Sequence, residues 1–172
     1  MPLPSTMTPI ATTTLGGAAT ITFSSIPATY TDLKLVIVGG TTRATTSDTI
    51  RVQFNSDTGA NYSSTYILGN GTVASSGRNS SSTNLFVEGI RLVGTTYGLN
   101  SMLTLDFMNY ANTTTYKTVI GRSNLPEQFG TTAVVGLWRS TSAISSIYLQ
   151  GDTVANFAIG TMATLYGIKA AS

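Results

Sequence analysis

Apolar and polar residues alternate with a period of two in many short segments of this chain. In "TIRVQFN", Ile50, Val52 and Phe54 share one face of an extended segment, and "MLTLDFMNY" (102–110) repeats the pattern. Alternation of this kind is typical of antiparallel strands with one buried face and one face in water. No window shows helical spacing, although "LPEQFG" (125–130) is long enough for a single helical turn. The pattern therefore predicts an all-β chain.

The segments between the expected strands are rich in Gly, Ser, Thr and Asn, which favour turns. About eight to ten short strands with such turns are typical of a β-sandwich or a jelly roll. The 172 residues suit one domain, so we expect a single antiparallel, jelly-roll-like sandwich over residues 10–172. Within it, the Gly/Ser/Asn-rich stretch 69–84 is expected to be a long exposed loop.

Residues 1–9 depart from the alternating pattern because they contain three prolines, Pro2, Pro4 and Pro9. Proline cannot donate a hydrogen bond to a neighbouring strand and favours an extended path. We therefore expect an extended N-terminal arm that leaves the domain, with a disordered tail as the alternative.

The composition excludes several classes of chemistry. The chain has no Cys and no His, so it lacks thiolates, sulfur-ligated zinc and the usual general base. Charged residues make up 9% of the chain, against about 25% in typical soluble domains. The net charge of +2 comes from scattered Lys and Arg rather than from a basic stripe, which argues against nucleic-acid binding. No apolar run is long enough for a signal peptide or a membrane helix, so we expect neither export by a signal nor a membrane partner.

The triplet Asp57-Thr58-Gly59 matches the signature of aspartic proteases, which need two such aspartates close together. The triplet does not directly follow an apolar strand, because Asn55 and Ser56 intervene. The alternative is a hairpin turn in which Asp57 starts an Asx-type turn and Gly59 takes a positive φ. We interpret the segment as a turn.

Other catalytic and metal-binding arrangements have weak support. A Ser–Lys pair would need Lys34, Lys117 or Lys169, and none lies in a recognisable motif. The sequence leaves open whether two of the seven acidic residues meet in a cleft. A calcium ion at Asn55, Asp57 and Asn61 is conceivable, but their spacing is not that of an EF-hand loop. We therefore expect no enzymatic activity, no catalytic residues, no cofactor and no metal.

Residues in the arm and isolated arginines are the candidates for contacts with other proteins. Trp138 is interpreted as a core residue, whereas the role of Arg139 stays open because Arg is enriched at interface hot spots. The full set of interaction candidates is Pro2, Leu3, Pro4, Met7, Arg43, Arg78 and Arg139.

Five segments in order resemble a family of small β-sandwich virion proteins of tailed bacteriophages, including phages of cyanobacteria. The segments are "TLGGAATITFSSIPATYTDLKLVIVGG", "RVQFNSDTGANYSS", "LDFMNYANTTTYKTVIGRS", "WRSTSAISSIYL" and "NFAIGTMATLYGI". The resemblance covers about residues 12–168 and omits the 69–84 stretch and the proline-rich start.

The resemblance implies a structural component of the phage particle with a jelly-roll-like fold. We expect a capsid decoration or cement protein on the outer surface of the virion, assembled in the host cytoplasm. Its partners would be the major capsid protein or other virion proteins, and copies of itself as a trimer or dimer. The alternative is a tail fibre or baseplate module whose loops bind host-surface glycans, with Tyr62, Tyr66 and Tyr97 as contacts.

Overall fold

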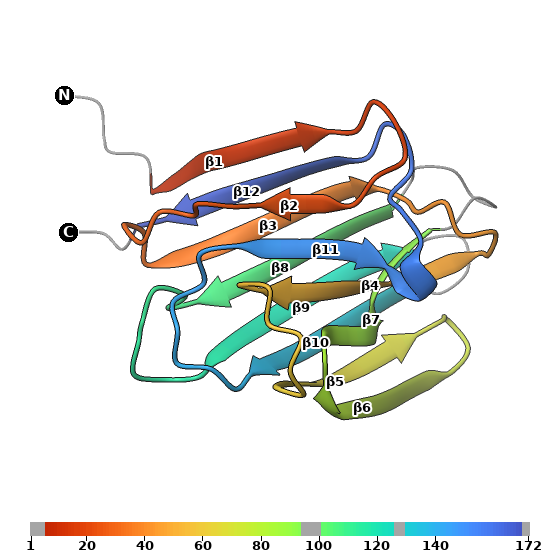
Figure 1. Cartoon of the computed structure of the whole chain (residues 1–172). Helices are drawn as coiled ribbons and strands as arrows, with labels where there is room; N and C mark the ends of the chain where they lie inside the picture. The colour runs from red at the N-terminus through yellow and green to blue at the C-terminus, as the bar shows by residue number, and fades with distance from the viewer. Residues whose placement is uncertain (1–5, 94–100, 126–129, 170–172) are drawn as a thin grey trace.

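The structure is a computed structural model that describes residues 6–93, 101–125 and 130–169. In these residues the chain forms two antiparallel sheets that pack face to face (Figure 1). The larger sheet has eight strands, in the spatial order β1 (Met7–Thr14), β12 (Met162–Ile168), β3 (Asp32–Gly39), β8 (Ser101–Met108), β9 (Lys117–Leu125), β10 (Gly130–Trp138), β5 (Tyr62–Gly69) and β6 (Ala74–Ser82). The smaller sheet has four, in the order β2 (Ile21–Phe23), β11 (Ile147–Gly151), β4 (Ser47–Phe54) and β7 (Leu85–Val93).

The strand pairing has jelly-roll topology. Strand β1 pairs with β12, β2 with β11, β3 with β8, and β4 with β7, so the chain folds back on itself as one long hairpin wrapped into two sheets. Two further hairpins, β5–β6 and β9–β10, are inserted into this framework and extend the larger sheet beyond β8. The expected fold, an antiparallel jelly-roll-like sandwich, is confirmed.

The core lies between the two sheets, where the apolar side of each alternating strand is buried. Ile50, Val52 and Phe54 of β4 are all fully buried, as the alternation predicts. The ring of Phe54 lies 5.4 Å from that of Trp138 and 5.7 Å from that of Phe107, centroid to centroid. Trp138 is 2% exposed, which confirms its interpretation as a core residue.

Strand β1 begins at Met7, inside the segment expected to be a free arm. Met7, Thr8 and Pro9 pair with β12, so the sandwich starts at Met7 rather than at residue 10. Pro9 is accommodated because β1 is an edge strand and its register shifts between Pro9 and Ala11. Pro2, Leu3 and Pro4 lie outside the described residues, so the rest of the predicted arm stays a prediction.

The stretch 69–84, expected to be a long loop, contains strand β6 instead. Seven residue pairs join β6 to β5, from Tyr62 opposite Ser82 to Gly69 opposite Ala74. Because β6 is an edge strand whose residues are largely exposed, pairing with β5 holds its backbone in the sheet without an apolar face. The sequence did not predict this strand because its residues are typical of turns.

The one-turn helix expected in 125–130 falls mostly on 126–129, outside the described residues.

In the described part of the chain, no helix is long and apolar enough to cross a membrane.

Candidate functional site

The outward-facing side of the larger sheet, here called the broad face, presents side chains in rows that cross all eight strands. One such row follows the pairing register from β1 to β6: Thr12, Thr164, Val36, Thr104, Arg122, Ala133, Ile67 and Ser76. The smaller sheet covers the opposite side of this sheet, in front of it in Figure 1, so the broad face has no covering layer among the described residues.

Large apolar side chains are concentrated on the broad face. Eleven are exposed among the described residues, and eight of these project from the broad face: Met7, Val38, Ile67, Met102, Met108, Ile120, Val135 and Met162. The other three, Val73, Tyr116 and Ile159, lie in connections between strands. A shallow hollow of about 200 Å³ between Ile67, Ile120 and Val135 marks part of this surface. Most of the exposed large apolar side chains therefore share one surface, where polar residues such as Thr104 and Arg122 lie between them.

The broad face has the size of a protein–protein interface. Eight strands spaced about 4.8 Å apart, each about eight residues long at ~3.3 Å per residue, span roughly 900 Å². A stable interface buries about 800 Å² on each partner.

Charge on the broad face is low. Lys34 and Asp106, side by side on β3 and β8, neutralise each other through a 2.6 Å contact between Nζ and Oδ1. Arg122 on β9 and Arg78 on β6, which faces the same side as Ser76, are exposed and have no hydrogen bond or ion pair with any described residue. Taken together, the exposed apolar side chains and the small net charge suit contact with a weakly charged protein surface.

The outward side of the smaller sheet, here called the narrow face, is polar. In pairing register, Tyr148 on β11 lies between Thr22 on β2 and Gln53 on β4. The narrow face also carries Arg51, whose guanidinium is paired with the carboxylate of Asp152, with Nη2 2.5 Å from Oδ1. The two outer surfaces of the sandwich therefore differ in chemical character.

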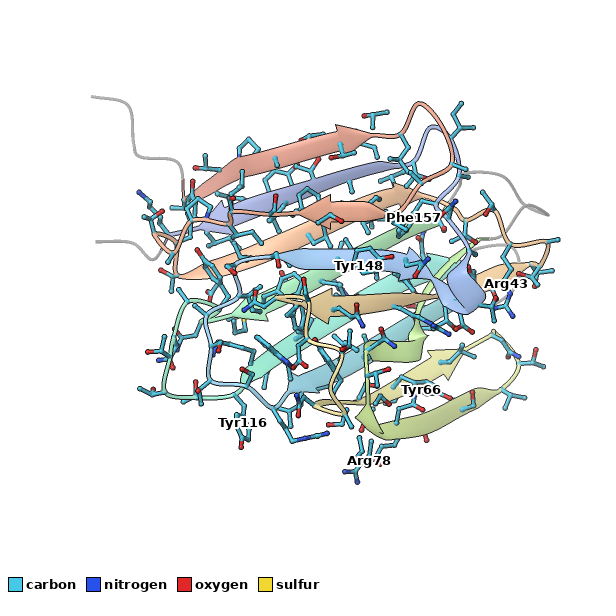
Figure 2. The ribbon with its side chains drawn as sticks, viewed as in Figure 1. Arg43, Tyr66, Arg78, Tyr116, Tyr148 and Phe157 are labelled. Carbon is cyan, nitrogen blue, oxygen red and sulfur yellow. The ribbon has the colours of Figure 1, made fainter. Side chains whose placement is uncertain are left out.

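The predicted interaction residues are dispersed over the molecule. Met7 and Arg78 both lie on the broad face, Arg78 on its edge strand β6 (Figure 2). Arg43 instead contacts the carboxylates of Asp48, at 2.9 Å, and Asp152, at 3.7 Å.

Arg139 has a role inside the fold. Its guanidinium donates hydrogen bonds to the carbonyl oxygens of Ala60 and Tyr62 and to Oγ of Ser63, which fixes the start of β5. Interface contact is therefore not needed to account for Arg139.

The apolar residues of the broad face were missed as a group. A signal was present, because segments such as "LVIV" (35–38) and "AVV" (133–135) are apolar on both sides of the strand. A strand that is covered on one side needs apolar residues on that side alone. Apolar residues on both sides therefore indicate a second apolar surface.

The Asp57 segment is a turn, as interpreted. Phe54 O accepts a hydrogen bond from Asp57 N across Asn55 and Ser56. The positive φ angles fall on these two central residues, at 52° and 58°, and not on Gly59 as expected. Positive φ at both central residues is a feature of type I′ turns, which Asn tolerates well. Contrary to expectation, the turn does not close a hairpin, because β4 belongs to the smaller sheet and β5 to the larger one.

The carboxylate of Asp57 is fully engaged with N–H donors. It accepts hydrogen bonds from Trp138 Nε1 at 2.6 Å, from Gly59 N at 2.8 Å and from Asn61 Nδ2 at 3.0 Å. Burial alone would raise the pKa of Asp57, but these hydrogen bonds outweigh it and lower the pKa. A carboxylate surrounded by N–H groups serves the fold and is not oriented for a cation or for a second catalytic aspartate.

Of the three tyrosines proposed as glycan contacts, the two that the structure describes lie in strand β5 and not on exposed loops. Tyr62 is fully buried, and its hydroxyl accepts a hydrogen bond from Phe54 N and donates one to Asp57 O. Tyr66 is half-buried against the core, and Tyr97 lies outside the described residues.

Among the described residues, the carboxylates of Asp48 and Asp152 come together because both form an ion pair with Arg43. The side chain of Asp48 is 0% exposed, and its Oδ2 has no hydrogen-bond partner among the described residues. Burial raises the pKa of Asp48, although the hydrogen bond from Arg43 acts in the opposite direction. No group of three or more metal-ligating His, Cys, Asp or Glu occurs in the described segments.

No known protein family matches the chain, and no curated protein matches it as a relative.

Proposed function

We propose that this chain is a structural protein of a bacteriophage particle, a decoration protein that attaches to the outside of the head through its broad face. The observation that carries the proposal is the concentration of eight exposed apolar side chains on one roughly 900 Å² surface of a two-layer sandwich. The resemblance of the five ordered segments to virion proteins of tailed phages supports the particle as the setting.

The proposed occupant of the broad face is a weakly charged, partly apolar surface of the shell protein. Such a surface matches the low charge of the broad face, where Lys34 and Asp106 already neutralise each other. Decoration requires rigidity and repeated contacts, and a jelly roll with a laddered eight-stranded sheet supplies a rigid attachment surface. Low charge, at 9% of residues, also limits repulsion between closely packed copies.

Binding of purified protein to phage heads that lack it tests the proposal. We expect Ile120→Lys and Val135→Lys, each of which puts a charge in the centre of the broad face, to weaken head binding at least tenfold. Ile159→Lys is the matched control, because Ile159 is 62% exposed but lies in the β11–β12 connection. Head binding is measured by co-sedimentation, with circular dichroism to confirm that each variant is folded.

Three results would overturn the proposal. The first is equal head binding by the broad-face variants and the wild type. The second is immunogold labelling that places the native protein only on the tail, which would favour the fibre or baseplate alternative. The third is a broad face that mediates only self-association, so that the lysine variants dissociate a dimer or trimer in light scattering without changing head binding.

A further inference from the structure

The narrow face contains a concavity whose chemistry differs from that of the rest of the surface. Its volume is about 500 Å³, within the range of about 300–1,000 Å³ typical of small-molecule sites. Seven residues from three strands and two adjoining connections line it: Thr22, Gln53, Ser56, Thr58, Ser146, Tyr148 and Gln150. Figure 2 shows Tyr148 on β11, in the front sheet. None of the seven side chains carries a formal charge.

Most polar side chains of this concavity make no hydrogen bond within the described fold. The side chains of six of the seven residues make no hydrogen bond with any described residue: Thr22, Ser56, Thr58, Ser146, Tyr148 and Gln150. Gln53 donates through Nε2 to Thr83 O, which leaves its Oε1 as an acceptor. The Asn residues of nearby turns behave differently, since Asn55 and Asn61 both bind neighbouring groups. Hydrogen-bonding groups that converge on a concavity without protein partners are available to a ligand.

The walls of the concavity are rigid. Asn55 Oδ1 accepts hydrogen bonds from the backbone N–H of Ser145 and Ser146, and its Nδ2 donates to Ala143 O, so the wall that carries Ser146 is fixed to the β4–β5 turn. The same turn is held by the hydrogen bond from Trp138 to Asp57. Strands β4 and β11 are paired with each other along the floor. A preorganised site loses little conformational entropy on binding.

We infer that this concavity is a binding site for a neutral carbohydrate. Sugars present many hydroxyl groups and no charge, which matches a lining of hydroxyls and two amides. An amide side chain offers both a donor and an acceptor to neighbouring sugar hydroxyls. Gln53 lies directly opposite Tyr148 on β4, and Gln150 is the next residue on the same side of β11. The ring of Tyr148 supplies an apolar surface for sugar C–H groups, with a hydroxyl at its tip.

Charged ligands are a poor match for the same site. The nearest cationic group in pairing register is Arg51, opposite Gln150, and it is held by Asp152. Neither an anion nor a cation would therefore find an unpaired counter-charge in the lining.

In the proposed decoration protein, attachment through the broad face would leave the narrow face turned away from the shell, where a sugar on another particle or cell is accessible. The carbohydrate site itself does not require that attachment.

An array of immobilised glycans is the direct test, with neutral gluco-, galacto- and manno-oligosaccharides beside sialylated and sulfated ones. The protein is biotinylated and displayed on streptavidin, so that several weak sites act together. We expect binding to neutral glycans. The best neutral glycan is then titrated into ¹⁵N-labelled protein, where saturable shifts are expected at the amides of Thr22, Gln53, Ser146, Tyr148 and Gln150.

Matched variants localise the binding. Tyr148→Ala and Gln150→Ala are expected to lower the apparent affinity at least tenfold. Tyr116→Ala is the control and should bind like the wild type, because Tyr116 is an exposed tyrosine (55%) in the β8–β9 connection, far from Tyr148 in Figure 2. The inference is overturned if no neutral glycan binds, if only charged glycans bind, or if Tyr148→Ala binds as well as Tyr116→Ala. We expect Tyr148→Ala to leave head binding unchanged, because Tyr148 lies on the narrow face, so a failure of the carbohydrate inference is distinct from a failure of the decoration proposal.

Discussion

At the scale of single residues, the Asp57 turn shows how a motif can point to the wrong chemistry. The residues that resemble a protease triplet form a hydrogen-bonded network that links the β4–β5 turn to the indole of Trp138. The sequence predicts the turn because Asn, Ser, Asp and Gly are turn residues. It does not predict the bond to Trp138, which is 81 residues away, because long-range hydrogen bonds have no local signature.

The first prediction concerns this network. Asp57→Ala leaves the buried N–H of Trp138 without an acceptor, which should lower the free energy of unfolding by about 2 kcal/mol. Urea denaturation at neutral pH measures the change. Thr58→Ala, an exposed change in the same turn, should cost far less. Equal effects of the two substitutions would contradict the role given to Asp57.

The Asp57 network also predicts a pH dependence. The pKa of Asp57 in the folded protein lies below its usual value of 3.8, so the carboxylate's contribution is fully present above that value and is lost as pH falls through the lowered pKa. The difference in unfolding free energy between wild type and Asp57→Ala should therefore shrink on acidification below about pH 4. A difference that stays constant with pH would contradict this account.

The contribution of Asp48 to stability should change with pH in the opposite direction to that of Asp57. Burial raises the pKa of Asp48 above 3.8, so the charged form destabilises the folded state, and this penalty is relieved as pH falls through the raised pKa. We expect Asp48→Asn to be more stable than wild type at neutral pH, with the difference decreasing as pH falls from the raised pKa toward 3.8. Thermal unfolding over a pH series measures this, and a less stable Asp48→Asn at neutral pH would contradict it.

At the scale of elements, alternation identifies strands well and fails where a strand lacks an apolar side. Strand β4 was evident from its alternating residues, whereas β6 has almost no apolar residues and was expected to be a loop. Pairing with β5 decides the structure of β6, and pairing is a tertiary property. The same reasoning applies to Met7, Thr8 and Pro9, whose partner β12 is almost at the other end of the chain.

Truncation tests the placement of β1. Deleting residues 1–5 should leave thermal stability unchanged, because β1 begins at Met7. Deleting residues 1–14 should lower it, because β12 loses its partner strand and Ile10 no longer packs against the core. Differential scanning calorimetry measures both, with hydrogen exchange at the β12 amides as a local readout. Identical melting of the two truncated chains would show that β1 adds nothing to the fold.

At the scale of the whole molecule, the principal feature is the contrast between the apolar broad face and the polar narrow face. The sequence predicts a sandwich from its short strands, and some strands are apolar on both sides. It does not say which strands share a sheet, and the broad face reaches its full width only because the inserted hairpins β5–β6 and β9–β10 join the larger sheet. The two faces were therefore not predictable as surfaces.

This contrast leads to one account of the molecule: a rigid sandwich attached to a phage head through its broad face. A reconstruction of the intact particle by electron cryomicroscopy tests it most directly. We predict density for this chain on the outside of the head, with Ile120 and Val135 against the shell protein and Tyr148 turned away from it. Density in which the broad face is exposed to solvent, or a chain found only on the tail, would contradict the account.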